Sequence, residues 1–166
     1  MVAPNHMFSI KSLKYGTPTG TGTVPATGDL TALPMMAKGS ISLDESESTV
    51  TDFYAEQSPY PIESIATENG KFTLTAKFND MNFATLAVFK GGTGNATSFE
   101  PATGWFQVKK AFVAELDSSH TFDFRNSQCM ARITDLGGRD KLGAWELKAT
   151  PLLCADGSAP YKINNL

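Results

Sequence analysis

The sequence contains few of the residues that carry most enzyme and metal chemistry. Its 166 residues include only two histidines and two cysteines, and neither Cys129 nor Cys154 belongs to a metal-ligand spacing. No serine lies in a G-x-S-x-G elbow. The glycine-rich segment GTPTGTG lacks the Lys-Ser/Thr ending with which a phosphate-binding loop contacts its ligand. We therefore expect no enzyme activity, no catalytic residues, no cofactor and no bound metal.

Long apolar runs are absent as well. No run approaches the roughly 20 residues that span a bilayer, so we expect no membrane association. The N-terminal residues lack the basic start and the apolar core of a secretory signal. Without such a signal, the two cysteines are expected to be reduced and buried, and a disulfide is the less favoured alternative. His120, next to an expected turn, is interpreted as a surface residue.

The charge balance is slightly acidic. The chain has 17 acidic and 14 basic residues, which gives a formal net charge of −3. Binding to nucleic acid requires a basic patch, so nucleic-acid binding is not expected as the main function. DNA could still pass close by without being bound. Charged residues make up 19% of the chain, a low fraction that favours β structure over helix.

The clearest local pattern lies at residues 68–92. The dipeptide Asn69-Gly70 predicts a type I′ turn, because both residues tolerate a positive φ. The strand that follows is predicted from strict alternation of apolar and polar residues, which places one set on a buried face. That set consists of Phe72, Leu74, Ala76 and Phe78.

A short helix is predicted directly after this strand. Asn79 or Asp80 could cap its first turn, and Gly91-Gly92 could end it. At about ten residues the helix is too short to persist in water unless it packs on a sheet. Its buried face is expected to hold Ala84, Ala87 and Val88, with Met81 one turn earlier.

The rest of the chain reads as strands and loops. The expected strands are residues 6–15, 38–43, 49–56, 62–67, 105–116, 121–124, 129–135 and 144–151, with a turn at Gly137-Gly138 and a last short extended segment. We expect one domain over residues 1–166, with long loops at about 16–36 and 44–61. The first loop is either a flexible excursion or an arm that orders against a neighbouring subunit, and the second is either a long hairpin or a projecting loop. The fold class is therefore mainly β, a sandwich or barrel of about eight strands flanked by one short α-helix.

The order of these segments resembles that of bacteriophage major tail proteins, the subunits of the tail tube. The matching features are an N-terminal strand, a Gly/Thr-rich stretch, GSISLDESES and a strand pair near Asn69-Gly70. The segment GKFTLTAKFNDMNFATLAVFKGGTG is similar to the strand-then-helix element of that family, and GAWELKATPLLCADGSAP to its last core strand and ending. The resemblance covers most of residues 36–160 and rests on order and pattern, because it includes no invariant chemical motif.

The resemblance implies a structural virion protein that self-assembles into hexameric rings. The rings stack into a tube for genome passage, as in type VI secretion tubes and contractile tails. The implied partners are other copies of the chain and the tail tip, tape-measure and terminator proteins, and DNA passes without specific binding. The implied location is the virion tail, after synthesis in the host bacterial cytoplasm.

A lumen that lets DNA slide should be polar or negative. The candidate lumen or inter-subunit residues are Asp44, Glu45, Glu47, Thr73 and Thr75. The alternative function is another β-sandwich virion or surface module, such as a head-decoration protein or a receptor- or carbohydrate-binding domain that uses Trp105, Tyr54 and Tyr60. The sequence is compatible with contractile and non-contractile tails, and with a phage, a prophage or an injection device.

Overall fold

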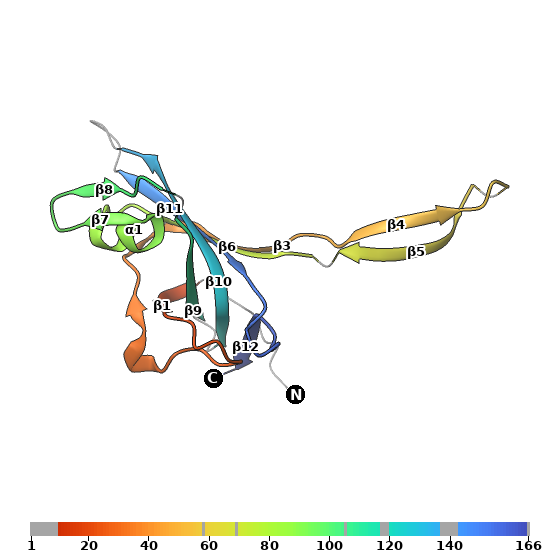
Figure 1. Cartoon of the computed structure of the whole chain (residues 1–166), viewed down its shortest axis with the longest axis horizontal. Helices are drawn as coiled ribbons and strands as arrows, with labels where there is room; N and C mark the ends of the chain where they lie inside the picture. Colours follow the sequence, from red (N-terminus) through yellow and green to blue (C-terminus); the bar gives the residue numbers. More distant parts are fainter. Residues whose placement is uncertain are drawn as a thin grey trace.

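The protein is mainly β, as the alternation of its side chains predicts. The computed structural model describes residues 10–57, 59–68, 70–104, 106–116, 120–136 and 143–165. A long sheet has the strand order β2-β1-β9-β10-β11-β6-β3, and β12 also pairs with β10. Its strands are β1 (Ile10–Gly16), β2 (Thr31–Ala32), β3 (Met36–Glu45), β6 (Phe72–Phe78), β9 (Val108–Leu116), β10 (His120–Asp135), β11 (Ala144–Pro151) and β12 (Tyr161–Asn165). The result is an open, sandwich-like fold (Figure 1).

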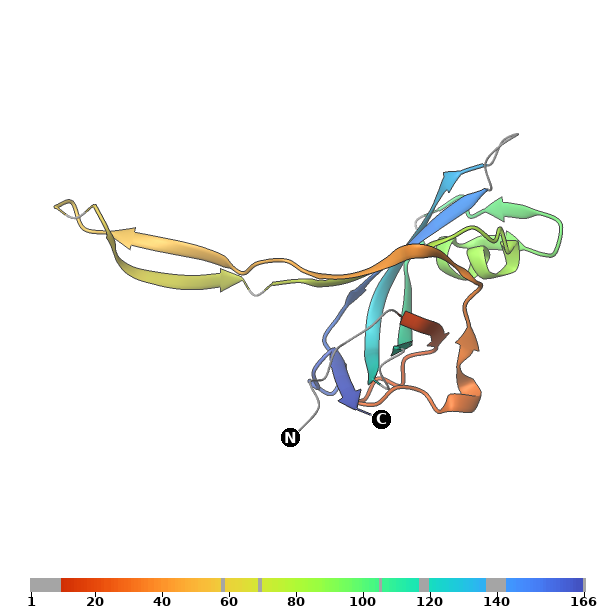
Figure 2. The ribbon, with the colours of Figure 1, turned by 180° about the vertical axis from the view of Figure 1, so that it is seen from behind.

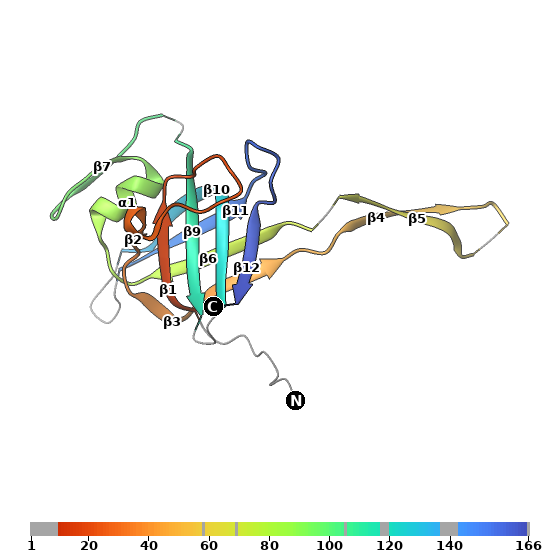
Figure 3. The ribbon, with the colours of Figure 1, turned by 90° about the horizontal axis from the view of Figure 1, so that it is seen from below.

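One strand, β10, joins the two layers of this fold. The sequence predicts two strands at 121–124 and 129–135, but they form one continuous strand of 16 residues. Its first part pairs with β12 and its last part with β11, while β9 pairs with both parts across a register shift between Phe124 and Ser127. Such an irregularity bends a strand. Seen from below, β1, β9 and β12 cross the direction of β6 (Figure 3).

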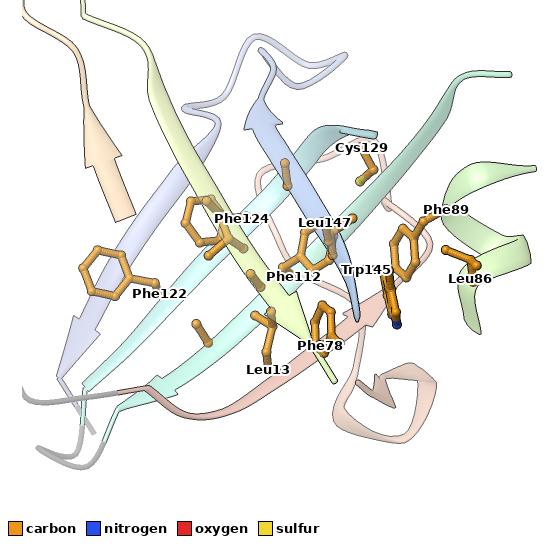
Figure 4. Close-up of a cluster of buried hydrophobic side chains, with 14 of the residues drawn as sticks. Leu13, Phe78, Leu86, Phe89, Phe112, Phe122, Phe124, Cys129, Trp145 and Leu147 are labelled. Atoms are coloured by element: carbon orange, nitrogen blue, oxygen red, sulfur yellow. The ribbon is translucent and has the colours of Figure 1, made fainter. Parts of the chain in front are cut away.

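Large side chains from both layers fill the space between them. Phe78 of β6 stacks on Trp145 of β11 with ring centroids 4.4 Å apart, and both residues are fully buried. Phe112 and Phe124 approach from the opposite layer (Figure 4). The predicted inward face of residues 72–78 and the predicted strand at 144–151 are thus confirmed.

The helix α1 (Phe83–Lys90) covers one end of this core, but with a different face from the one predicted. Its buried residues are Leu86 and Phe89, whereas Ala84 is exposed. The cap also differs, because Asn82 rather than Asn79 or Asp80 accepts a hydrogen bond of 3.0 Å from the amide of Thr85. Four residues, 79–82, separate the end of β6 from the first residue of the helix, so the helix and its cap begin later than predicted.

The helix ends where the glycine pair predicts. Gly91 has a φ of 77° and its amide donates to the carbonyl of Ala87. A Cβ on Gly91 would overlap the ring of Phe106, so glycine is required for space as well as for backbone conformation. A small hairpin follows, made of β7 (Gly92–Gly94) and β8 (Phe99–Pro101).

The prediction of a hairpin turn at Asn69-Gly70 is wrong. Asn69 lies outside the described residues, and its neighbours belong to strands that pair elsewhere: β5 (Pro61–Glu68) with β4 (Thr49–Tyr54), and β6 with β3 and β11. Gly70 instead lies so close to the carbonyl of Ser46 that a Cβ would overlap it. The Asn-Gly signal therefore marks a close approach of two strands, and the turn lies between β4 and β5.

Residues 16–36 fold back on their own chain. They form a short 3₁₀ helix, Thr27–Asp29, and strand β2, which pairs with β1 at Lys14 and Tyr15. The amide of Gly22 also donates to the Asp156 carboxylate at 2.9 Å. Through these contacts residues 16–36 pack against the rest of their own chain, unlike the flexible excursion given as one alternative above. The first residues of the predicted strand 6–15 and the predicted turn at Gly137-Gly138 lie outside the described residues.

Candidate functional site

The most conspicuous surface feature is a long projecting hairpin. We call residues 44–68, which comprise the end of β3 and strands β4 and β5, the arm, and all other residues the body. The arm leaves the body as a two-stranded ribbon (Figures 1 and 2), and every described residue of β4 and β5 is exposed. The long hairpin alternative for residues 44–61 is thus confirmed.

The arm carries large apolar side chains on both of its faces. Phe53 and Ile65 lie on one face and Val50 and Ile62 on the other, according to the pairing of β4 with β5. Ile62 is 68% exposed, and Tyr60 near the end of the hairpin is 76% exposed. A two-stranded hairpin is marginally stable in water. Contiguous exposed apolar groups mark an interaction surface.

Charge is divided unevenly between the arm and the body. The arm contains seven of the 17 acidic residues and none of the 14 basic residues. Ten acidic and 14 basic residues remain in the body, so the arm has a formal charge of −7 and the body of +4. The arm and the body therefore carry formal charges of opposite sign.

The structure brings together three of the five candidate lumen residues. Asp44 pairs with Thr73 across β3 and β6, and Thr75 lies two residues further along the same face. Glu45 pairs with Phe72 and so belongs to the opposite face, at the root of the arm. Glu47 lies in the link between β3 and β4, where the ribbon continues through hydrogen bonds between Ser46 and Lys71.

The sheet face that holds Thr73 and Thr75 is polar and of mixed charge. Lys148 lies beside Thr75, and Glu146 lies between Lys77 and Arg132 in the strand pairing. The Arg132 guanidinium forms a 2.8 Å ion pair with Glu146. The strand pairing also places Lys109 and Met130, which is 61% exposed, on this face. Basic and acidic side chains thus share the face, and it is not acidic.

An apolar groove that the sequence analysis did not identify lies between the two ends of the sheet. It is lined by residues of β1 and β3, by the segment that joins β2 to β3, and by Phe72, Leu116, Phe122 and Ile163. Its volume is about 880 Å³. No local sequence motif predicts this groove, since its walls come from segments far apart in the sequence.

Other predicted sites receive less support from the described residues. Tyr54 and Tyr60 lie near the end of the arm, and Trp105 is outside the described residues. His120 is buried in β10, so its interpretation as a surface residue is wrong. Cys129 and Cys154 are buried and free, as predicted. In the described ranges no cluster of three or more His, Cys, Asp or Glu residues could hold a metal ion, and no helix is long and apolar enough to cross a membrane.

Comparisons with known proteins do not assign a family to the chain. No protein-family model matches the sequence, and no curated protein matches it significantly.

Proposed function

We propose that this chain is a self-assembling structural subunit of a phage tail tube, which forms stacked hexameric rings around a channel for the genome. The observation that carries the proposal is the arm: an exposed ribbon with apolar side chains on both faces and a formal charge of −7. The resemblance in the order of the sequence segments supports the choice of a tail tube among possible assemblies.

An arm that binds the body of another copy uses two different surfaces, which makes the contact head-to-tail. Such contacts repeat and generate either a closed ring or an open filament. The charge difference between arm and body favours this pairing over an arm-to-arm dimer. Rings and stacked tubes are therefore the expected products.

The polar face of β3, β6, β11 and β10 is the proposed lumen surface. Thr73 and Thr75 offer hydroxyl groups without a fixed charge, and the ion pair with Glu146 neutralises Arg132, one of the basic side chains of this face, which also holds Lys77 and Lys148. In this proposal the lumen passes DNA without gripping it. The same assembly would contact the tail tip, tape-measure and terminator proteins at its ends.

The experiment measures the assembly of the full chain as its concentration rises. Sedimentation velocity should show species of about six subunits, and negative-stain images should show rings or tubes with a central channel. Raising the salt concentration should slow assembly, because salt screens the attraction between exposed charges. A strictly monomeric profile at high concentration, with no rings in the images, contradicts the proposal. A monomer or trimer that binds glycans would support the alternative surface module.

A shortened variant provides the control. Glu45 pairs directly with Phe72, so replacing residues 46–71 by Asn-Gly should close β3 and β6 with a two-residue turn. The buried core contains no residue of β4 or β5, so the body should keep its fold, which near-UV circular dichroism can verify. This variant should remain monomeric at concentrations at which the full chain assembles.

A further inference from the structure

We infer that the apolar groove between β1 and β3 is the site that receives the arm of a second copy of the chain. The inference rests on the self-assembly part of the proposed function and adds the receiving site. The groove and the arm are both apolar features of the described surface, and they belong to different parts of the molecule.

The groove lies between β1 and β3, where the sheet is open, and is not a depression in a closed surface. β3 ends the sheet on one side. On the other side β2 pairs with β1 at Lys14 and Tyr15, and the amide of Leu33 donates to the carbonyl of Leu13 at 2.9 Å. Ile10–Ser12 of β1 border the groove beyond this pairing with β2. Edges of this kind pair readily with a strand of another chain. An extended ribbon therefore has the right shape for this opening.

The chemistry of the groove matches that of the arm. Leu13 and Phe122 lie at its buried side, and Met35 on its rim is 89% exposed. The arm offers Phe53, Ile62 and other large apolar side chains that water surrounds in the isolated subunit. Lys11 also lines the groove, and the arm carries only acidic charges. Burial of apolar area and charge attraction thus favour the same contact.

The arm of the same copy is badly placed to fill this groove. In all three views of the ribbon the arm extends away from the body, while β1 remains in the body (Figures 1, 2 and 3). An arm that bent back would have to break the ribbon at its root, where Ser46 and Lys71 bond to each other. A second copy requires no such rearrangement, and its use makes the contact head-to-tail.

The test places a photo-reactive benzoylphenylalanine at Phe53 or at Ile62 in the full chain. Labelled and unlabelled copies are mixed, irradiated and digested, and mass spectrometry identifies links between copies. The expected links join the arm to the groove segments, namely residues 10–13 and 33–43. Links to the polar face of β6 and β11, or to other arms, would overturn the groove as the receiving site while leaving self-assembly intact. Absence of both links and oligomers would overturn the proposed function itself.

Two matched charge variants measure the contribution of the groove. Met35→Glu puts a negative charge on the groove rim, and Leu153→Glu puts the same charge at another exposed apolar position of the body, 67% exposed. Both variants should fold, since neither side chain is buried. Met35→Glu should weaken self-association by at least about tenfold, and Leu153→Glu should change it by less than about twofold. Equal effects of the two variants on self-association would overturn the inference. So would unimpaired assembly of subunits to which native mass spectrometry shows a small apolar molecule bound.

Discussion

The indole Nε1 of Trp145 donates a hydrogen bond of 2.9 Å to the backbone carbonyl of Asp80. The bond joins the fully buried side chain of β11 to the segment between β6 and α1. It holds the start of the helix against the sheet, at the position where the backbone leaves the strand.

Replacing Trp145 by Phe should reveal the strength of this connection. The variant leaves the Asp80 carbonyl without its donor and removes part of a ring that packs on Phe78. We expect the free energy of unfolding to fall by about 1–3 kcal/mol, measured by denaturant titration. Leu153→Ala, at an exposed position, should stay within about 0.5 kcal/mol of the wild type. Equal stability of Trp145→Phe and the wild type contradicts this role.

The helix cap can be tested against the caps that the sequence suggests. Asn82→Ala removes the acceptor of the Thr85 amide and should lower the free energy of unfolding by about 1 kcal/mol. Asn79→Ala, at an exposed position before the helix, should have almost no effect. The reverse order of the two effects would mean that the helix begins earlier than Phe83.

Gly91 should not tolerate a side chain. Alanine at this position combines a φ of 77° with overlap between its Cβ and the Phe106 ring, so a loss of at least about 2 kcal/mol in unfolding free energy is expected. Gly28→Ala is the matched control, because nothing lies within 4 Å of the added atom. Thermal or denaturant unfolding of the two variants compares them. A tolerated Gly91→Ala would contradict the described helix end.

Glu115 should make stability depend on acid. Lys14 and Ser12 donate to its carboxylate at 2.6 and 2.8 Å, and the bond from Lys14 is the main cause of a lowered pKa. A lowered folded-state pKa stabilises the protein above the unfolded value of about 4.3, and this contribution is lost as pH falls through the folded value. Because the pair is partly exposed, we expect Glu115→Gln to cost at most about 1 kcal/mol at pH 7.

The cost of Glu115→Gln should shrink toward zero as the pH of the unfolding experiment is lowered below the folded-state pKa. Glu100→Gln, an exposed carboxylate on β8, is the control and should leave stability nearly unchanged at both ends of the range. A cost of Glu115→Gln that does not change with pH would mean that the carboxylate charge is not what stabilises this contact.

The two thiols should be inert in the folded protein. Burial raises the pKa of Cys129 to about 12, and Cys154 is buried as well. Because the thiolate is the reactive form, a thiol reagent at pH 8 should label neither cysteine until denaturant is added, when both should react. Met35→Cys, at an exposed position, should supply one rapidly labelled thiol. Rapid labelling of the wild type would show that one of these cysteines is accessible.

The sequence by itself determined those elements whose cause is local. The alternation of side chains predicts the buried face of β6 and the position of β11 correctly, because a period of two is enough to define a half-buried strand. The end of the helix was predicted because Gly91 can adopt a φ that other residues avoid. The acidity of the arm was also visible, since residues 44–68 contain no lysine or arginine.

Tertiary structure decided the features that depend on distant partners. The buried face of α1 could not be read from FATLAVFK, because apolar residues occur on every side of so short a helix and the sheet selects Leu86 and Phe89. Asn69-Gly70 suggests a turn locally, but pairing of β6 with β3 and β11 stabilises a continuous ribbon instead. The groove needs β1, β3, β10 and β12 at once, and no local pattern encodes their approach, because it results from the packing of the whole sheet.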